Sequence, residues 1–516
     1  MKFFSPYLSA GLLFLVPAAM LGDVRLPEIF SDHMVLLQGS EIPVWGWAAP
    51  GEEITVSVHP AGEGNAAALQ SQKATALADG SWRINLAPIQ TPTPLKLQIR
   101  ANNQITIEDV AVGEVWLGSG QSNMAMTVNR AMNFDEEKQK ATLPNLRMFR
   151  EESGPAHAPQ KDSKGKWIVC SPDTVGNFSA TLYFFGREIH QTLQTPVGLI
   201  NSSVGGTPIE SWIASEAQEA NADLKPFFEL LSNDKSSVVT ESAIQNYQKE
   251  IAQWKEDVRK ARAQKEKIPR PPKNPAGATE RSGGIGGLFN GKIAPLIPFA
   301  IRGALWYQGE ANSTPTKAPF YEAQLRLLIN DWRGRWGQEF PFAWAQLPNF
   351  GGQGRDWPAV REAMLKTLAL PKTGMGINID IGDEKNIHPQ NKQEVGRRLS
   401  LWALGTVYHR AVSATSGPLP KGHEIHGEEI ILKFSHIDGG LMAKGGLLKG
   451  FTIAGEDKQW KPANARIDGD DVIVSSPEVK APTAARYAWT NFPECNLYNA
   501  AGLPASPFRT DSWPNP

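Results

Sequence analysis

The sequence predicts an α/β protein whose parallel sheet is preceded and followed along the chain by β modules. Between residues 106 and 414, short apolar runs alternate with helical patterns, which is typical of a parallel sheet covered by helices. On both sides of this region, alternating apolar and polar residues separated by clusters of Gly, Pro and Asn indicate antiparallel strands. We therefore expect a β-sandwich module over 23–105, the α/β domain over 106–414, and a second β module over 415–516.

Length, charge and cysteine content narrow the class of protein. A chain of 516 residues is too long for one hydrophobic core. The 52 basic and 53 acidic residues nearly cancel, so no overall field attracts nucleic acid or an anionic membrane. Cys170 and Cys495 are the only cysteines and make no disulfide framework, so we expect two free, buried thiols.

The N-terminal residues 1–22 have the order of a secretory signal peptide. Lys2 precedes an apolar segment from Leu8 to Val16, and small residues follow up to Gly22. We therefore expect an exported protein, either periplasmic or secreted. No later segment reaches about 18 uninterrupted apolar residues, so we expect no membrane anchor.

The two β modules are predicted from short alternating runs. In the first module, apolar residues alternate with polar ones at 54–58 and again at 95–99. In the last module, the same pattern appears at 430–434 and 472–474. The first module carries no side chains that indicate chemistry, so we expect the site in the α/β domain.

The α/β domain contains four apolar runs that each end in a loop rich in glycine and polar residues. The predicted strands are 113–117, 197–201, 301–307 and 376–380, and their loops are 118–126, 202–207, 308–312 and 382–389. In open α/β sheets, ligands bind beyond the carboxyl ends of the strands. We therefore expect these four loops to form one site.

A helical insertion of about residues 215–275 separates the second and third predicted strands. Its apolar residues are spaced 3, 4, 3 and 4 apart from Ile244 to Val258, which predicts an amphipathic helix that ends before the proline-rich segment 268–272. A solvated helix packed on the domain explains this pattern better than a partner-binding coil.

Ser122 and His388 are the candidate pair for chemistry. Ser122 stands where the first glycine-lined turn enters a helix, so it is either an N-cap or a nucleophile. His388 follows an acidic loop at a strand end, and a serine nucleophile requires such a base. The lipase-type Gly-x-Ser-x-Gly motif is absent, because Met124 stands in place of its last glycine. Since no HExxH motif occurs, we expect no metal site.

Acyl transfer by a serine also requires hydrogen-bond donors for the developing oxyanion. The backbone amides of Ser122, Gly205 and Gly206 are suitable donors, because glycines let the backbone approach a substrate closely. The side-chain amide of Gln308 or Asn312 is a further candidate. Together these groups fill the roles that ester hydrolysis requires.

Four motifs occur in the loops of the α/β domain. They are Gly-Gln-Ser-Asn-Met at 120–124, Ser-Ser-Val-Gly-Gly-Thr-Pro-Ile-Glu-Ser-Trp at 202–212, Trp-Tyr-Gln-Gly-Glu-Ala-Asn at 306–312, and Ile-His-Pro with Asn-Lys-Gln-Glu-Val-Gly-Arg-Arg-Leu at 387–399. In this order they resemble the sialate O-acetylesterase family of the SGNH hydrolase superfamily. The resemblance implies a flavodoxin-like SGNH hydrolase domain, Ser122 as nucleophile and His388 as base. It also implies no cofactor and an O-acetylated glycan as substrate, most simply a 9-O-acetylated sialic acid.

The chain departs from the family pattern at the acidic residue that would orient the histidine. The superfamily often carries an aspartate three residues before its histidine, where this chain has Lys385. Asp383 is the nearer acid in the loop, so we predict that it orients His388. Asp380 and a Ser-His dyad without an acid remain alternatives.

Three other functions stay open at this point. An acetylxylan or other polysaccharide acetylesterase would keep the mechanism and change the substrate. A non-catalytic glycan-binding protein would use the β modules, and a glycosidase would use paired carboxylates such as Glu310 and Asp383. The arginines that we consider as partners for the carboxylate of a sialic acid are Arg302, Arg355, Arg397 and Arg398.

Overall fold

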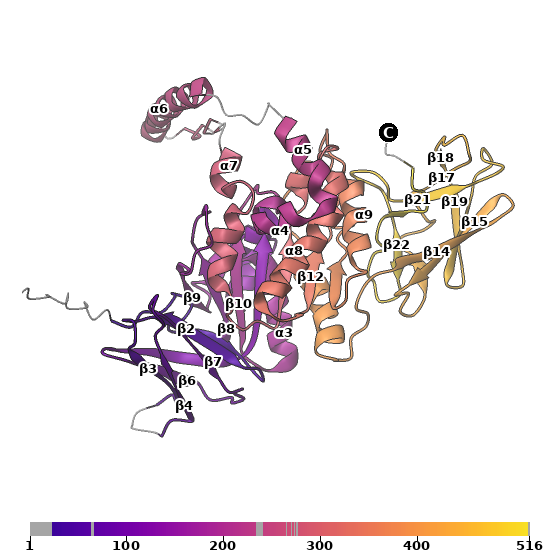
Figure 1. The fold of residues 1–516 in the computed structure, drawn as a ribbon. Coiled ribbons are helices and arrows are strands. Elements are labelled where there is room, and N and C mark those ends of the chain that lie inside the picture. The colour runs from indigo at the N-terminus through magenta and orange to yellow at the C-terminus, as the bar shows by residue number, and fades with distance from the viewer. Residues whose placement is uncertain are drawn as a thin grey trace, which may run out of the picture.

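The computed structural model of the chain describes residues 23–62, 67–233, 241–264, 266–269, 271–272, 274 and 277–513. The predicted signal peptide at 1–22 lies outside these residues, as do parts of the predicted insertion. An α/β domain lies between an N-terminal and a C-terminal β module (Figure 1). Within the described ranges, no helix is long and apolar enough to cross a membrane.

The centre of the molecule is a sheet with the strand order β13-β12-β11-β7-β10-β8-β9. Its strands are β7 (Gln104–Gly120), β8 (Leu143–Glu151), β9 (Gly165–Cys170), β10 (Val197–Ser203), β11 (Gly303–Tyr307), β12 (Phe342–Ala345) and β13 (Thr373–Gly376). Neighbouring strands are parallel except for β8 and β9, so the predicted parallel sheet is confirmed. The strand predicted at 376–380 is corrected to β13. Beyond it, the side chain of Asn378 donates to the carbonyls of Gln346 and Gly376, and the chain leaves the sheet.

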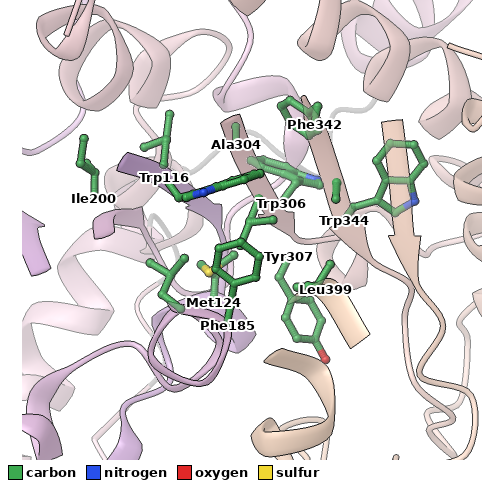
Figure 2. Packing of buried hydrophobic residues seen from close by; sticks show 14 of the residues in the cluster. Trp116, Met124, Phe185, Ile200, Ala304, Trp306, Tyr307, Phe342, Trp344 and Leu399 are labelled. Atoms are coloured by element: carbon green, nitrogen blue, oxygen red, sulfur yellow. The ribbon is translucent and has the colours of Figure 1, made fainter. Parts of the chain in front are cut away.

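Helices cover both faces of this sheet. The main ones are α1 (Ser122–Ala125), α2 (Phe134–Gln139), α3 (Ala180–Leu193), α8 (Tyr321–Trp336), α9 (Trp357–Thr367) and α10 (Lys392–Trp402). Trp306 of β11 pairs with Ser119 of β7, so Trp306 and Trp116 point to opposite faces. Trp116 packs on Phe185 of α3, whereas Trp306 packs on Trp332 of α8. Figure 2 shows this buried aromatic core.

The strand β7 belongs to both the N-terminal module and the central sheet. The other strands of the module are β1 (Val35–Leu37), β2 (Ile42–Trp47), β3 (Glu53–Pro60), β4 (Gln70–Thr75), β5 (Ser81–Leu86) and β6 (Leu95–Arg100). The first part of β7 pairs with β6 in an antiparallel manner, and its second part pairs with β10 and β11 in parallel. The domain boundary expected between 105 and 106 therefore lies inside one continuous strand.

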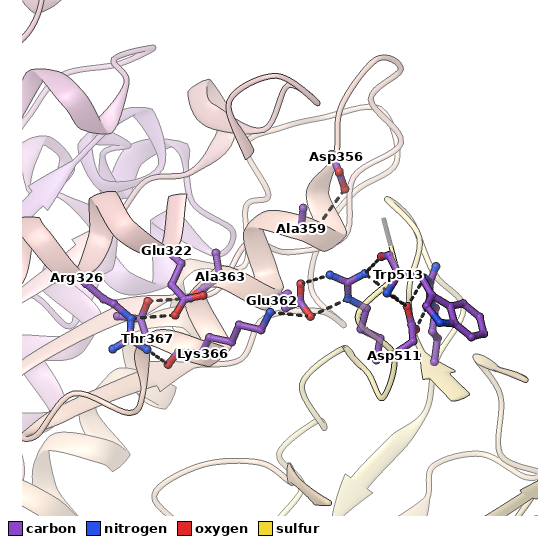
Figure 3. A network of polar contacts seen from close by, with 12 residues as sticks. Glu322, Arg326, Asp356, Ala359, Glu362, Ala363, Lys366, Thr367, Asp511 and Trp513 are labelled. Carbon is purple, nitrogen blue, oxygen red and sulfur yellow. Dashed lines mark hydrogen bonds and ion pairs between the residues drawn. The ribbon is translucent and has the colours of Figure 1, made fainter. Parts of the chain in front are cut away.

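The C-terminal module is antiparallel and is fastened to the α/β domain. Its strands are β14 (Leu419–His426), β15 (Glu429–Ser435), β16 (Leu441–Ala443), β17 (Phe451–Ala454), β18 (Lys461–Pro462), β19 (Asn464–Asp468), β20 (Asp471–Ser475), β21 (Ala484–Tyr487), β22 (Leu497–Asn499) and β23 (Phe508–Arg509). Arg361 of α9 is fully buried and donates to the carbonyls of Leu347 in the domain and Asn491 in the module. Arg509 of the module also donates from two nitrogens to Glu362 of α9 (Figure 3).

Among the described residues, the α-helices of the insertion are α4 (Ser215–Ala220), α5 (Lys225–Asn233) and α6 (Glu241–Gln264), and α7 (Gly277–Ser282) follows it. The predicted amphipathic helix is α6, which stands away from the sheet in Figure 1. Trp254 of α6 stays half-buried, and its Nε1 donates to the carbonyl of Pro269 at 2.8 Å. This helix therefore contacts the segment that follows it, and the expected packing on the domain is corrected.

The two cysteines are free, as predicted. Cys170 is buried, and burial raises the pKa of its thiol to about 12. Cys495 is only partly buried, so the expectation of burial holds fully for Cys170 alone. In the described part of the chain, no three His, Cys, Asp or Glu side chains gather in a way that would hold a metal ion.

Candidate active site

The strand β7 ends in a glycine turn that presents Ser122. A Cβ on Gly120 would lie 2.2 Å from the carbonyl oxygen of Tyr307, and the φ of Gly120 is +133°, so the turn requires glycine there. Ser122 is the first residue of α1, and the N-cap position is Gln121, which makes no side-chain cap. Instead, Oγ of Ser122 lies 2.8 Å from Nε2 of His388. The hydroxyl therefore faces the histidine rather than the helix.

His388 lies half-buried in the loop between β13 and α10. With Nε2 unprotonated, the ring accepts a hydrogen bond from Oγ of Ser122. Burial lowers the pKa of His388, and the positive charges of Arg130 and Lys392 lower it further. The ring is therefore neutral at neutral pH, which is the state that a general base requires.

The structure does not bring Asp383 to His388, so the predicted third residue of the site is corrected. The exposed carboxylate of Asp383 accepts hydrogen bonds from the backbone amides of Lys385 and Asn386, at 2.8 and 2.9 Å. It closes a local turn, a role that aspartate commonly takes. Asp380 is held in an ion pair with an arginine of α10. Among the described residues, none makes a hydrogen bond to Nδ1 of His388, so the arrangement is a Ser-His dyad.

Two backbone amides lie free at the nucleophile. A Cβ on Gly205 would be 3.5 Å from Cβ of Ser122, so the glycine loop passes directly beside the serine. Gly206 follows with φ of +73°, a conformation that favours glycine. Over the described ranges, neither the amide of Ser122 nor that of Gly205 donates to an acceptor. Both are available for an oxyanion.

Gln308 and Asn312 are fully buried and link the loops to each other. Nε2 of Gln308 donates to the carbonyl of Thr207 at 3.2 Å and to Oδ1 of Asn312 at 2.7 Å. Both N–H groups of Gln308 are thus used, and its predicted oxyanion role is corrected to a structural one. Nδ2 of Asn312 donates to Glu210 at 2.7 Å, which leaves one N–H of Asn312 without a partner among the described residues.

A buried polar network of Asn123, Glu310 and Lys392 lies behind the dyad. Nδ2 of Asn123 donates to Glu310 at 2.5 Å, and its Oδ1 accepts from Nζ of Lys392 at 2.7 Å. Asn123 also donates to the carbonyl of Ile387 at 3.0 Å, and Lys392 donates to the carbonyl of Pro389 at 2.9 Å. Because Ile387 and Pro389 flank the catalytic histidine candidate, the network fixes that histidine through its backbone.

Burial shifts the pKa values of both ionisable groups in this network. It raises the pKa of Glu310 and lowers the pKa of Lys392 to about 7, a shift that the negative charge of Glu310 opposes. The second carboxylate oxygen of Glu310 is buried without a hydrogen-bond partner in the described part of the chain. Nζ of Lys392 lies 5.2 Å from the centre of the Tyr307 ring, so an aromatic face adds to its two oxygen partners.

The sequence does not reveal this network. It points to Glu310 only as one carboxylate of a glycosidase pair, and it does not single out Asn123 or Lys392. Both residues lie inside the motifs at 120–124 and 387–399, but asparagine and lysine side chains are normally exposed, so the sequence does not indicate their burial. Since Glu310 is bound to Asn123 and Asp383 lies at an exposed turn, the two do not form a glycosidase pair.

Arg130→Gln is expected to move the acid limb of kcat/KM to higher pH. Activity requires neutral His388, so it falls as the pH drops through the pKa of His388. The charge of Arg130 lowers that pKa, so removing the charge raises it, and activity is then lost at a higher pH. The measurement is kcat/KM for a neutral ester across the acidic range. Arg259→Gln, which removes an exposed charge on α6, should leave the limb in place, and an unmoved limb in Arg130→Gln would contradict the prediction.

Comparison with known proteins places the chain in a family. The family model for carbohydrate esterases described as sialic acid-specific acetylesterase matches residues 112–269 and 291–403. The sialate O-acetylesterases of Rattus norvegicus and Homo sapiens are 28% and 26% identical to the chain, over 94% of it and over 94% and 92% of their own lengths. The crystal structure of a carbohydrate acetylesterase from Xanthomonas citri is 33% identical and superposes with a TM-score of 0.79, covering 95% of this chain and 100% of that one.

The two matched segments together span more than half of the chain. The first contains Ser122 and the glycine loop, and the second contains Glu310 and His388. Both halves of the site are thus covered, and the chain is a carboxylic ester hydrolase that belongs to the carbohydrate esterase family of sialic acid-specific acetylesterases.

Proposed function

We propose that the protein hydrolyses O-acetyl groups of sugars through Ser122 and His388, with 9-O-acetylated sialic acids as substrates. The observation that carries this proposal is the 2.8 Å contact between Oγ of Ser122 and Nε2 of His388, beside two unused backbone amides. The sugar and the acetyl group are supported by the family description and by relatives named sialate O-acetylesterase.

The reaction follows from the positions of these groups. Oγ of Ser122 attacks the acetyl carbon while its proton passes to Nε2 of His388. The amides of Ser122 and Gly205 donate to the oxyanion of the tetrahedral intermediate. When the intermediate collapses, the bond to the sugar oxygen breaks and His388 returns the proton to that oxygen. Water, deprotonated by His388, then attacks the acetyl-enzyme. The bond between Oγ of Ser122 and the acetyl carbon breaks, His388 returns the proton to Oγ, and acetate leaves.

The network of Asn123, Glu310 and Lys392 takes the place of an orienting acid in this proposal. A carboxylate on Nδ1 would hold the ring directly, whereas this network holds the backbone on both sides of it. Nδ1 then keeps its proton without a fixed acceptor, and Nε2 is the basic nitrogen. Export through residues 1–22 belongs to the same proposal, and it is supported by the order of Lys2, the apolar segment and the small residues.

Acetate release from paired substrates tests the proposal. The protein, expressed from the full chain, should act on 9-O-acetylated N-acetylneuraminic acid with a kcat/KM at least about tenfold above that for acetylxylan, because a site built for one polar substrate rejects another. A preference for acetylxylan would make the protein a polysaccharide acetylesterase. If neither substrate releases acetate and a serine-directed phosphonate does not label the protein, the result would favour a non-catalytic glycan-binding protein. The intact mass of the same preparation tests removal of residues 1–22.

A further inference from the structure

Arg281 of α7 lies over the glycine loop of the site. Its Nη2 is 3.5 Å from the position that a Cβ on Gly206 would take, and its Nη1 is 3.3 Å from the corresponding position on Gly277. The neighbouring Gly205 faces Ser122 in the same way, at 3.5 Å. Because consecutive Cα atoms are about 3.8 Å apart, the guanidinium lies within about 14 Å of the Ser122 side chain.

The guanidinium of Arg281 is exposed and uncommitted. No hydrogen bond or ion pair joins it to any residue that the structure describes. The arginines that the sequence suggests for a carboxylate are engaged elsewhere: Arg302 with Glu114, Arg397 with Glu394, Arg398 with Asp380, and Arg355 with the carbonyl of Glu310. Arg281 differs from them because its guanidinium lies beside the glycine loop and has no partner in the described part of the chain.

Contacts of the segment that follows α7 hold the backbone near Arg281 close to the site. The amide of Gly286 donates to the carbonyl of Glu210 at 3.0 Å, and Oγ of Ser215 donates to the carbonyl of Ile285 at 3.3 Å. A Cβ on Gly286 would lie 2.4 Å from Oγ of Ser215, so the close approach depends on glycine. These contacts tie α7 to the loop that carries the glycines beside Ser122.

We infer that Arg281 binds the carboxylate of an acidic sugar whose O-acetyl group lies at Ser122. A guanidinium offers a planar fork of N–H donors that matches a carboxylate with two parallel hydrogen bonds. In a nine-carbon sugar acid, the carboxylate and a terminal O-acetyl group lie at opposite ends, so one molecule reaches both groups. This inference rests on the proposed function and adds the residue that selects an anionic sugar. Arg281 lies between the two segments that the family model matches.

The test compares one substrate with and without its charge. Arg281→Gln should raise KM for 9-O-acetylated N-acetylneuraminic acid about 10- to 100-fold with little change in kcat, since it removes binding shared by the ground and transition states. KM for the methyl ester of the same substrate should stay unchanged. Arg410→Gln is the matched control, because Arg410 is also exposed, its side chain has no partner in the described part of the chain, and it lies near Glu114, away from Ser122. Its effect on KM for the acid should remain within about threefold.

A binding measurement separates this inference from the proposed function. Calorimetry with free N-acetylneuraminic acid should show that Ser122→Ala binds the acid and that Ser122→Ala with Arg281→Gln binds it about 10- to 100-fold more weakly. If the enzyme releases no acetate yet this difference is found, the proposed function fails and the role of Arg281 stands. Equal KM changes for acid and methyl ester, or equal binding by the two variants, would overturn the inference.

Discussion

Ser122→Ala is expected to lower kcat for acetate release about 10⁴- to 10⁶-fold while the fold is retained. The change removes the hydroxyl that lies 2.8 Å from Nε2 of His388, and the smaller alanine side chain fits the same turn. No acetyl-enzyme then forms, and hydrolysis proceeds only by the weaker help of the loop amides. The measurements are the steady-state rate, labelling by a serine-directed phosphonate and the thermal unfolding midpoint.

Two control variants sharpen this result. Ser203→Ala changes a serine at the end of the neighbouring strand whose hydroxyl donates to Asn201, so kcat should stay within about tenfold of wild type. Asp383→Asn should also stay within about tenfold, because a triad acid would cost about 10⁴-fold whereas this side chain only closes a turn. Retention of more than a hundredth of the activity in Ser122→Ala would exclude the serine mechanism.

Lys392→Met is expected to lower kcat about 10²-fold and the free energy of unfolding by about 3 kcal/mol. The methionine fills the same space but donates to neither Asn123 nor the carbonyl of Pro389, so the histidine loop loses an anchor. The variant also removes a positive charge that lowers the pKa of His388, so the acid limb of kcat/KM should move to higher pH. Kinetics across pH and denaturant unfolding measure the three effects.

Lys385→Met is the matched control for this variant. Lys385 lies exposed in the same loop, and its side chain has no partner within the described ranges. We therefore expect kcat to stay within about twofold of wild type and the free energy of unfolding to stay unchanged. Glu310→Gln removes the buried charge but keeps an oxygen for Asn123, so its loss of kcat should be smaller than that of Lys392→Met. If Lys392→Met lowers the stability but leaves kcat and the pH profile unchanged, the network stabilises the fold and does not position His388.

The sheet and the dyad are predictable from sequence because they depend on local patterns. Apolar runs that end in glycine-rich loops fix where strands stop, and parallel strands bring those ends to one edge. Ser122 and His388 both follow such ends, so their meeting requires no knowledge of side-chain contacts. The four motifs, taken in order, resemble one family, and that resemblance implies the roles of Ser122 and His388 as nucleophile and base.

The sequence does not predict which hydrogen-bond partner a side chain takes, because that choice depends on contacts in the folded structure. Gln308 has the right group for an oxyanion, but Thr207, more than a hundred residues away, accepts one of its two N–H groups. Asp383 has the right charge for His388, but the amides of its own turn are closer and cost less entropy to reach. The burial of Lys392 likewise depends on residues far from it in the chain, since Nζ contacts Asn123 of α1 and the ring of Tyr307 in β11.

The shared strand β7 bears on how such enzymes can be rebuilt. One 17-residue strand begins in the N-terminal module and ends two residues before Ser122. Because backbone pairing along this strand is continuous, a change in the orientation of the module would also shift the end of the strand that precedes the nucleophile. Recombination between residues 105 and 106, the boundary expected from the sequence, would divide this strand. Exchange of the module between related enzymes has to carry the strand with it as far as Gly120.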